Sequence, residues 1–176
     1  MISKLFKTFN KKKKILALPE AEQLRLRELI MRCDLDLITN EFTTDNVDIL
    51  LEELTPFQWA IYENCEVLIN HFIKLGADIN RPYLDGNSAL IIVCGQGSVE
   101  LAEILLKNQA SLSYINENKT SAIWYATTDV NPKLVRLLLE YGADPFTDTG
   151  NGKSSYEIAK IMHLEEIVAI MEEFRK

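Results

Sequence analysis

The sequence predicts an all-α protein in which helix-turn-helix units stack as a solenoid and are joined by β-turn fingers. Two observations favour this fold. Residues of the same kind recur every 33 positions after Leu51, and each recurrence carries the signals of two helices and a tight turn. The chain has 176 residues, 47% apolar and 26% charged, which is enough to bury a substantial core. Seven glycines and five prolines are ordinary usage, so the composition argues against collagen and disorder.

The 33-residue period appears in several columns of equivalent positions. Hydroxyl residues open the series at Thr55, Ser88, Ser121 and Ser154. Large apolar residues follow two positions later, at Phe57, Leu90, Ile123 and Tyr156. Small residues follow five positions later, at Ala60, Val93, Ala126 and Ala159. Because these columns match without a gap, we expect one structural unit per period.

Each period predicts a first helix, a turn, a second helix and a finger. The hydroxyl residue is expected to cap a first helix of about ten residues by accepting a bond from a backbone N–H. Second helices are expected near 100–107 and 133–141. Gly76 and Gly142 follow such helices, where a left-handed residue is favoured. The pairs Asp85–Gly86 and Asn151–Gly152 then indicate tight turns.

The chain before Leu51 is less regular. We expect helices over 22–32 and 34–42, which together would form a degenerate capping unit at 19–51. Residues 1–18 form a basic segment with six lysines among the first 14 positions and apolar residues at helical spacing. That segment has two interpretations: contact with an anionic membrane, or a short helix docked on the body, which we favour.

At two motifs the sequence resembles the ankyrin repeat family. The family pattern Thr-Pro-Leu-His-x-Ala is matched at residues 55–60, and Gly-Ala-Asp-x-Asn is matched at residues 76–80. On this resemblance the units fall at 52–84, 85–117, 118–150 and a truncated C-terminal cap at 151–176. The family histidine is replaced, by Gln58, Ile91, Trp124 and Glu157. Gln109 stands where Gly76 and Gly142 stand, and Lys119 where Gly86 and Gly152 stand.

The resemblance implies a protein-recognition module that uses its concave face and carries no catalytic residues. We accordingly expect no enzyme activity, no cofactor and no metal site. His71 and His163 lie in different units and have no cysteine at metal-ligand spacing. Gly95, Gln96 and Gly97 lack the Lys-Ser/Thr that follows a phosphate-binding loop.

The family's variable positions give a candidate surface for a partner. On the first helices these positions are Trp59, Tyr62, Glu63, Ile92, Gln96, Tyr125, Asp129, Ile158 and Met162. On the fingers they are Tyr83, Leu84, Asp85, Asn87, Glu117, Lys119, Asp148 and Lys153. Aromatic residues commonly anchor protein interfaces, and flanking acids tune encounter. For Trp59 and Tyr125 the alternative is packing between neighbouring units.

Charge indicates the kind of partner. Residues 15–176 carry 13 basic and 26 acidic residues, a net charge of −13, which disfavours nucleic acid and favours a basic protein. We hypothesise a bacterial immunity (antitoxin) protein that neutralises a basic toxin and is monomeric when free. The alternatives are a membrane-associated adaptor held by residues 1–14 and a host-directed scaffold.

Three cysteines, Cys33, Cys65 and Cys94, have no metal-type spacing and are expected to be free buried thiols in a reducing compartment. Residues 1–18 contain no apolar run typical of a secretory signal, and no stretch is long and apolar enough to span a membrane. We therefore expect a cytoplasmic protein.

Overall fold

The computed structural model describes residues 18–148, 150 and 152–175. These residues form α-helices joined by turns; apart from an isolated bridge between Leu51 and Leu54, no β-pairing occurs among them. The chain divides into two compact units, one ending at Asp78 and one beginning at Ile79. None of the helices in these residues is long and apolar enough to cross a membrane. The expected helix within residues 1–14 lies outside the described residues.

The first unit contains two helix pairs, whose bounds are α2 (Glu20–Met31), α3 (Leu35–Ile38), α4 (Pro56–Tyr62) and α5 (Glu66–Lys74). Helix α2 packs against α4, and α3 packs against α5. The expectation of a helix over 34–42 was wrong, because α3 has only four residues. The side chain of Asn46 accepts a hydrogen bond from Thr43 N and donates one to Glu41 O, which holds the following residues in turns.

The apolar side chains of both pairs form the core of the first unit. Ile30 and Phe72 have no exposed surface, and Phe42 is 2% exposed. The rings of Phe42 and Phe72 meet edge to face, with centroids 5.3 Å apart. At the surface, the Arg27 guanidinium binds the Glu52 carboxylate at 2.8 Å.

Cys33 and Cys65 form a disulfide, with Cα atoms 5.8 Å apart, so the expectation of three free thiols was wrong. Each residue lies just after the first helix of its pair, and the packing of α2 on α4 brings the two together. Cys94 is free and buried, and burial raises the pKa of its thiol to about 12. The cysteines therefore no longer argue for a reducing compartment.

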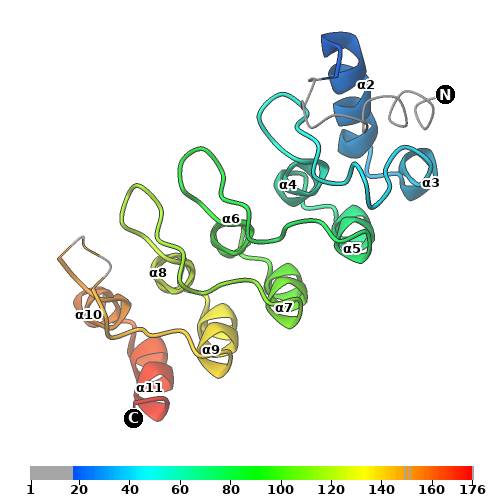
Figure 1. Cartoon of the computed structure of the whole chain (residues 1–176). Helices are drawn as coiled ribbons and strands as arrows, with labels where there is room; N and C mark the ends of the chain where they lie inside the picture. Colours follow the sequence, from blue (N-terminus) through cyan, green and yellow to red (C-terminus); the bar gives the residue numbers. More distant parts are fainter. Residues whose placement is uncertain (1–17, 149, 151, 176) are drawn as a thin grey trace. The chain divides into compact units, whose positions relative to one another are not determined.

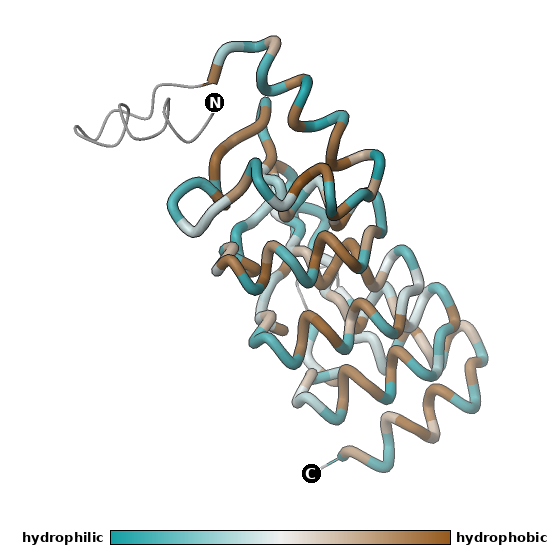
Figure 2. Tube along the Cα trace, turned by 90° about the vertical axis from the view of Figure 1, so that its right-hand side faces the viewer, coloured by the Kyte–Doolittle hydropathy of each residue, from teal (hydrophilic) through white to brown (hydrophobic). Residues whose placement is uncertain are grey.

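The second unit has two rows of helices, as Figure 1 shows. One row holds α6 (Ala89–Gly95), α8 (Ala122–Thr128) and α10 (Ser155–Ile161). The other holds α7 (Val99–Lys107), α9 (Pro132–Glu140) and α11 (Glu165–Glu173). Each helix contacts its pair mate and the next helix in its own row. Figure 2 shows apolar and polar residues alternating along the helices, as expected when only one side of each helix is buried.

The hydroxyl residues that open the periods are N-caps, as predicted. Thr55, Ser88, Ser121 and Ser154 each accept a hydrogen bond from the backbone N–H three residues later. The helices that they open have seven residues instead of the expected ten or so. They end early because a left-handed residue follows two positions beyond each, at Asn64, Gly97, Val130 and His163.

The second helices end as the sequence predicts. Gly76 and Gly142 adopt φ angles of 88° and 94°, and Gln109 takes the same left-handed conformation at 65°. Lys119 replaces a turn glycine and likewise has a positive φ, of 61°. The finger that contains Lys119 therefore keeps its turn without a glycine.

Candidate partner-binding surface

The fingers of the second unit are the segments 79–87, 112–120 and 145–153. Side-chain and backbone hydrogen bonds tie the first finger to its neighbour. Asn80 Oδ1 accepts from Ser111 N at 2.8 Å, Asn80 Nδ2 donates to Gln109 O at 3.1 Å, and the Tyr114 hydroxyl donates to Asn80 O. Nearer the tips, Asn116 Nδ2 donates to the Asn87 side chain at 2.8 Å. These bonds hold the exposed tips at a defined spacing.

Most of the predicted finger residues are accessible. Leu84 is 72% exposed, and Asp85, Glu117, Lys119, Asp148 and Lys153 are exposed as well. Asn87 is half-buried, and Tyr83 is only 5% exposed, so the Tyr83 side chain is part of the core and not of the surface. This corrects its inclusion among the predicted contact residues.

Two of the finger carboxylates also stabilise their own turns. Asp85 accepts hydrogen bonds from the Asn87 backbone at 3.1 Å and from the Asn87 side chain at 2.6 Å. Asp148 accepts from Gly150 N at 2.8 Å and from Gly152 N at 3.1 Å. Their charges face solvent while their geometry is set by the finger.

The first helices of the second unit present two columns of predicted residues. Ile92, Tyr125 and Ile158 form a half-buried column at equivalent positions of α6, α8 and α10. Gln96, Asp129 and Met162 form an exposed column at the C-caps of these helices. An apolar strip beside exposed polar side chains, here those of Gln96 and Asp129, is typical of a protein interface.

The ring of Tyr125 packs partly within the chain. A methyl group added at Gly95 would lie 3.7 Å from ring carbon Cδ1 of Tyr125, so the ring covers the end of α6. Its other neighbour is Trp124, whose ring centroid lies 5.4 Å away. Tyr125 therefore combines packing between neighbouring helices with partial exposure.

In the first unit, Tyr62 is 44% exposed and Glu63 is exposed. Trp59 is half-buried, and its indole N–H donates to Leu51 O at 3.1 Å.

Sequence reasoning missed several exposed apolar residues of the second unit, among them Ile161, which is 56% exposed at the end of α10, and Val130 and Ile115, which are 51% and 46% exposed. Ile161 is adjacent to Met162, which is 42% exposed. Ile161 lies three periods after Tyr62, which was among the predicted contact residues. Extending the predicted contact from Tyr62 to the equivalent positions of the later repeats would have included Ile161.

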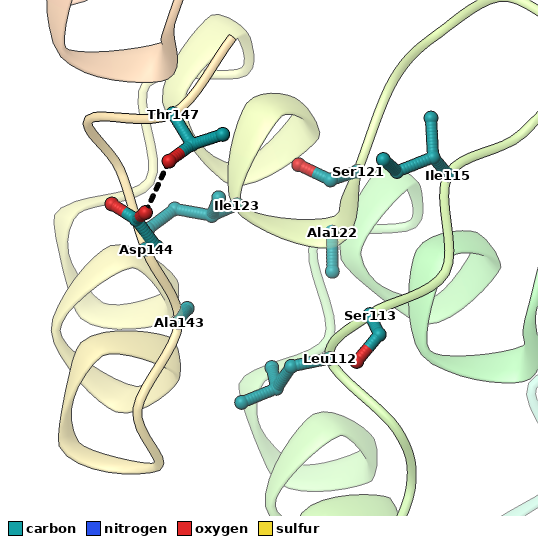
Figure 3. A pocket seen from close by; sticks show the side chains of 9 residues that line it. All are labelled: Leu112, Ser113, Ile115, Ser121, Ala122, Ile123, Ala143, Asp144 and Thr147. Carbon is teal, nitrogen blue, oxygen red and sulfur yellow. Dashed lines mark hydrogen bonds between the residues drawn. The ribbon is translucent and has the colours of Figure 1, made fainter. Parts of the chain in front are cut away.

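A shallow hollow of about 210 Å³ lies at the base of two fingers (Figure 3). Its lining is mostly small or apolar, and its one carboxylate, Asp144, accepts a hydrogen bond from the Thr147 hydroxyl. That bond is the main reason why the pKa of Asp144 lies below its usual value. Figure 3 shows Asp144 turned toward Thr147, so its carboxylate is used within its own turn. Among the described residues, no group of three or more His, Cys, Asp or Glu side chains could hold a metal ion.

The second unit consists of repeated helix pairs. Hydroxyl residues cap the first helices, the helices lie in two rows, and hydrogen-bonded fingers join the pairs. These features define a helical repeat protein. A family model described as ankyrin repeats, three copies, matches residues 57–149. The chain belongs to the ankyrin repeat family. This repeat is a non-enzymatic fold for protein–protein interaction, and ankyrin repeats bind other proteins.

Similar proteins come from several kinds of organism. Alpha-latroinsectotoxin-Lt1a of Latrodectus tredecimguttatus is 28% identical over 53% of this chain and 7% of its own length. BCL-6 corepressor-like protein 1 of Homo sapiens is 29% identical over 53% of this chain and 5% of its own length. Ankyrin repeat protein R664 of Acanthamoeba polyphaga mimivirus is 24% identical over 73% of this chain and 83% of its own length. The chain thus spans less than a tenth of the first two relatives.

Proposed function

We propose that this chain is a non-enzymatic binding protein that recognises a basic partner protein through the first helices and fingers of its second unit. In this proposal it neutralises the partner, as a bacterial immunity (antitoxin) protein would. It acts in the cytoplasm, is a monomer when free and does not bind nucleic acid. Its proposed organisation is three repeats, at 52–84, 85–117 and 118–150, between an N-terminal cap at 19–51 and a C-terminal cap at 151–176.

The observation that supports this proposal most directly is the mixture of exposed acidic and apolar side chains on the second unit. Leu84, Ile161 and Met162 offer apolar surface that the unit itself does not bury. Exposed acids lie on neighbouring repeats of the same unit, with Glu117 on the finger 112–120 and Asp129 at the C-cap of α8. Apolar anchors supply affinity, whereas acids accelerate encounter with a basic protein and select against acidic ones.

The proposal is tested with a partner recovered from the native cell or encoded next to this chain. The purified pair should form a stoichiometric complex, and complex formation should abolish the partner's activity. Because the attraction is electrostatic, the association rate should fall as salt is raised from about 50 to about 500 mM. An association rate independent of salt would argue against the basic partner.

A matched pair of charge reversals locates the surface. Asp129→Lys lies at the end of α8, on the proposed surface, and should slow association and weaken its salt dependence. Glu140→Lys makes the same change at an exposed position of α9, in the other row, and should leave the association rate within about twofold of the wild-type value. Equal effects of both variants would contradict the proposed surface.

A further inference from the structure

The two half-cystines of the first unit differ in accessibility. Cys33 is exposed in the turn that follows α2, whereas Cys65 is 2% exposed at the N-cap of α5. An incoming thiolate must reach a disulfide sulfur from solvent, and exchange is governed by this access. Cys33 is therefore the sulfur that can be attacked.

We propose that the Cys33–Cys65 disulfide is a reversible thiol-exchange site for a small thiol of the glutathione class, and that it controls the stability of the first unit. The attacking thiolate forms a bond to Cys33 Sγ while the Cys33–Cys65 bond breaks, and Cys65 Sγ leaves with the electron pair and takes a proton. A second thiolate then attacks the sulfur of the small thiol in the mixed disulfide and releases Cys33 as a thiol. The small thiol is oxidised to its own disulfide, and the two cysteines are reduced.

The position of the disulfide explains why its state matters to the fold. It joins the turn after α2 to the start of α5, two segments separated by 32 positions in the sequence. Besides core contacts, the links from α2 to the following chain include the exposed Arg27–Glu52 ion pair, the Arg27 guanidinium over the Trp59 ring and a hydrogen bond from Glu52 N to the Gln23 side chain. An exposed ion pair contributes little to stability. Opening the link restores the freedom of a long loop to the unfolded chain.

Trp59 reports on this change, because its ring is covered by α2. The Arg27 guanidinium lies 5.3 Å from the centre of the Trp59 ring. If reduction loosens α2, Trp59 becomes more accessible to a small quencher. The Trp124→Phe variant leaves Trp59 as the only tryptophan in the chain and isolates this signal.

The first experiment compares oxidised and reduced full-length chain. Reduced glutathione should yield a mixed disulfide that mass spectrometry maps to Cys33. Complete reduction should lower the midpoint of thermal unfolding by about 10 °C and increase acrylamide quenching of Trp59 in the Trp124→Phe background. An adduct on Cys65, or the same midpoint in both states, would overturn the proposal.

Two variants that each lack one half-cystine test the asymmetry, and Cys94, which both retain, is the internal control. Cys65→Ala leaves exposed Cys33, which oxidised glutathione should modify at least about tenfold faster than it modifies Cys65 in Cys33→Ala. Cys94 is buried and should stay unmodified in the folded protein. Equal modification rates in the two variants would count against Cys33 as the attacked sulfur. The wild-type mapping remains decisive if either variant fails to fold.

Discussion

The indole N–H of Trp59 donates a hydrogen bond to the carbonyl oxygen of Leu51 across 3.1 Å. The Arg27 guanidinium covers the same ring from α2. Trp59 thus connects α4 to the chain that precedes it within the first unit. These contacts favour packing as the role of Trp59, which was one of the two interpretations that the sequence left open.

The two tryptophans should respond differently to replacement by phenylalanine. Trp59→Phe removes the bond to Leu51 and should lower the free energy of unfolding by about 1 kcal/mol. Trp124 Nε1 is buried and has no hydrogen-bond partner among the described residues. Trp124→Phe should therefore cost less than about 0.5 kcal/mol. Urea unfolding followed by circular dichroism measures both, and a larger loss for Trp124→Phe would contradict the assignment.

A second prediction concerns Gln109 and Gly142, which occupy equivalent left-handed positions after α7 and α9. A residue with a Cβ pays a steric penalty in this region, and glycine does not. Gln109→Gly should therefore stabilise the chain by about 0.5 kcal/mol, and Gly142→Ala should destabilise it by about 1 kcal/mol. Thermal unfolding midpoints should move in opposite directions, and a loss in both variants would refute this account.

The features that the sequence predicted well are those that depend on neighbours within a few residues. The cap of α6 needs only Ser88 and the N–H of Ile91 three residues later. The left-handed end of α5 needs only Gly76. Such local signals, repeated every 33 residues, were enough to predict the helices of the second unit.

Features that depend on distant residues were harder to predict. Tyr83 was expected on the surface, but its exposure depends on what packs over it and not on its position in a finger. The disulfide joins Cys33 and Cys65, which are 32 positions apart, close to one 33-residue period. Alignment of the degenerate unit 19–51 with the next repeat would have placed the two cysteines at nearly equivalent positions and predicted that they lie side by side. Of the residues predicted to contact a partner, Gln96, Asp129 and Met162 are exposed, and their contact with a partner stays a prediction; their apolar neighbour Ile161 was not among those residues.

A third prediction concerns Asn80, whose side chain connects successive repeats. Asn80→Ala removes the acceptor for Ser111 N and the donor to Gln109 O and should lower the free energy of unfolding by about 1–2 kcal/mol. Asn118 is exposed at the tip of the next finger, and Asn118→Ala should cost no more than about 0.5 kcal/mol. Chemical denaturation compares them, and equal losses would show that the Asn80 bonds do not stabilise the second unit.

The last prediction is a dependence of stability on pH through Glu157. Ser154 N and the Ser154 hydroxyl both donate to Glu157 Oε2, at 2.8 and 3.0 Å, and these bonds hold the pKa of Glu157 below its ordinary value of 4.5. A carboxyl whose pKa is lower in the folded state stabilises the fold above its unfolded pKa, and this contribution disappears as the pH falls through the folded pKa.

The first unit supplies a neutral version of the same capping box, in which Gln58 Oε1 accepts from Thr55 N at 2.9 Å. Glu157→Gln should therefore keep the fold at neutral pH and reduce the loss of stability below pH 4.5. Urea unfolding at several pH values measures the difference, with Glu166→Gln at an exposed position of α11 as the matched control for removing one charge. If both variants flatten the pH profile equally, the effect comes from net charge, whereas flattening by Glu157→Gln alone assigns it to the capping box.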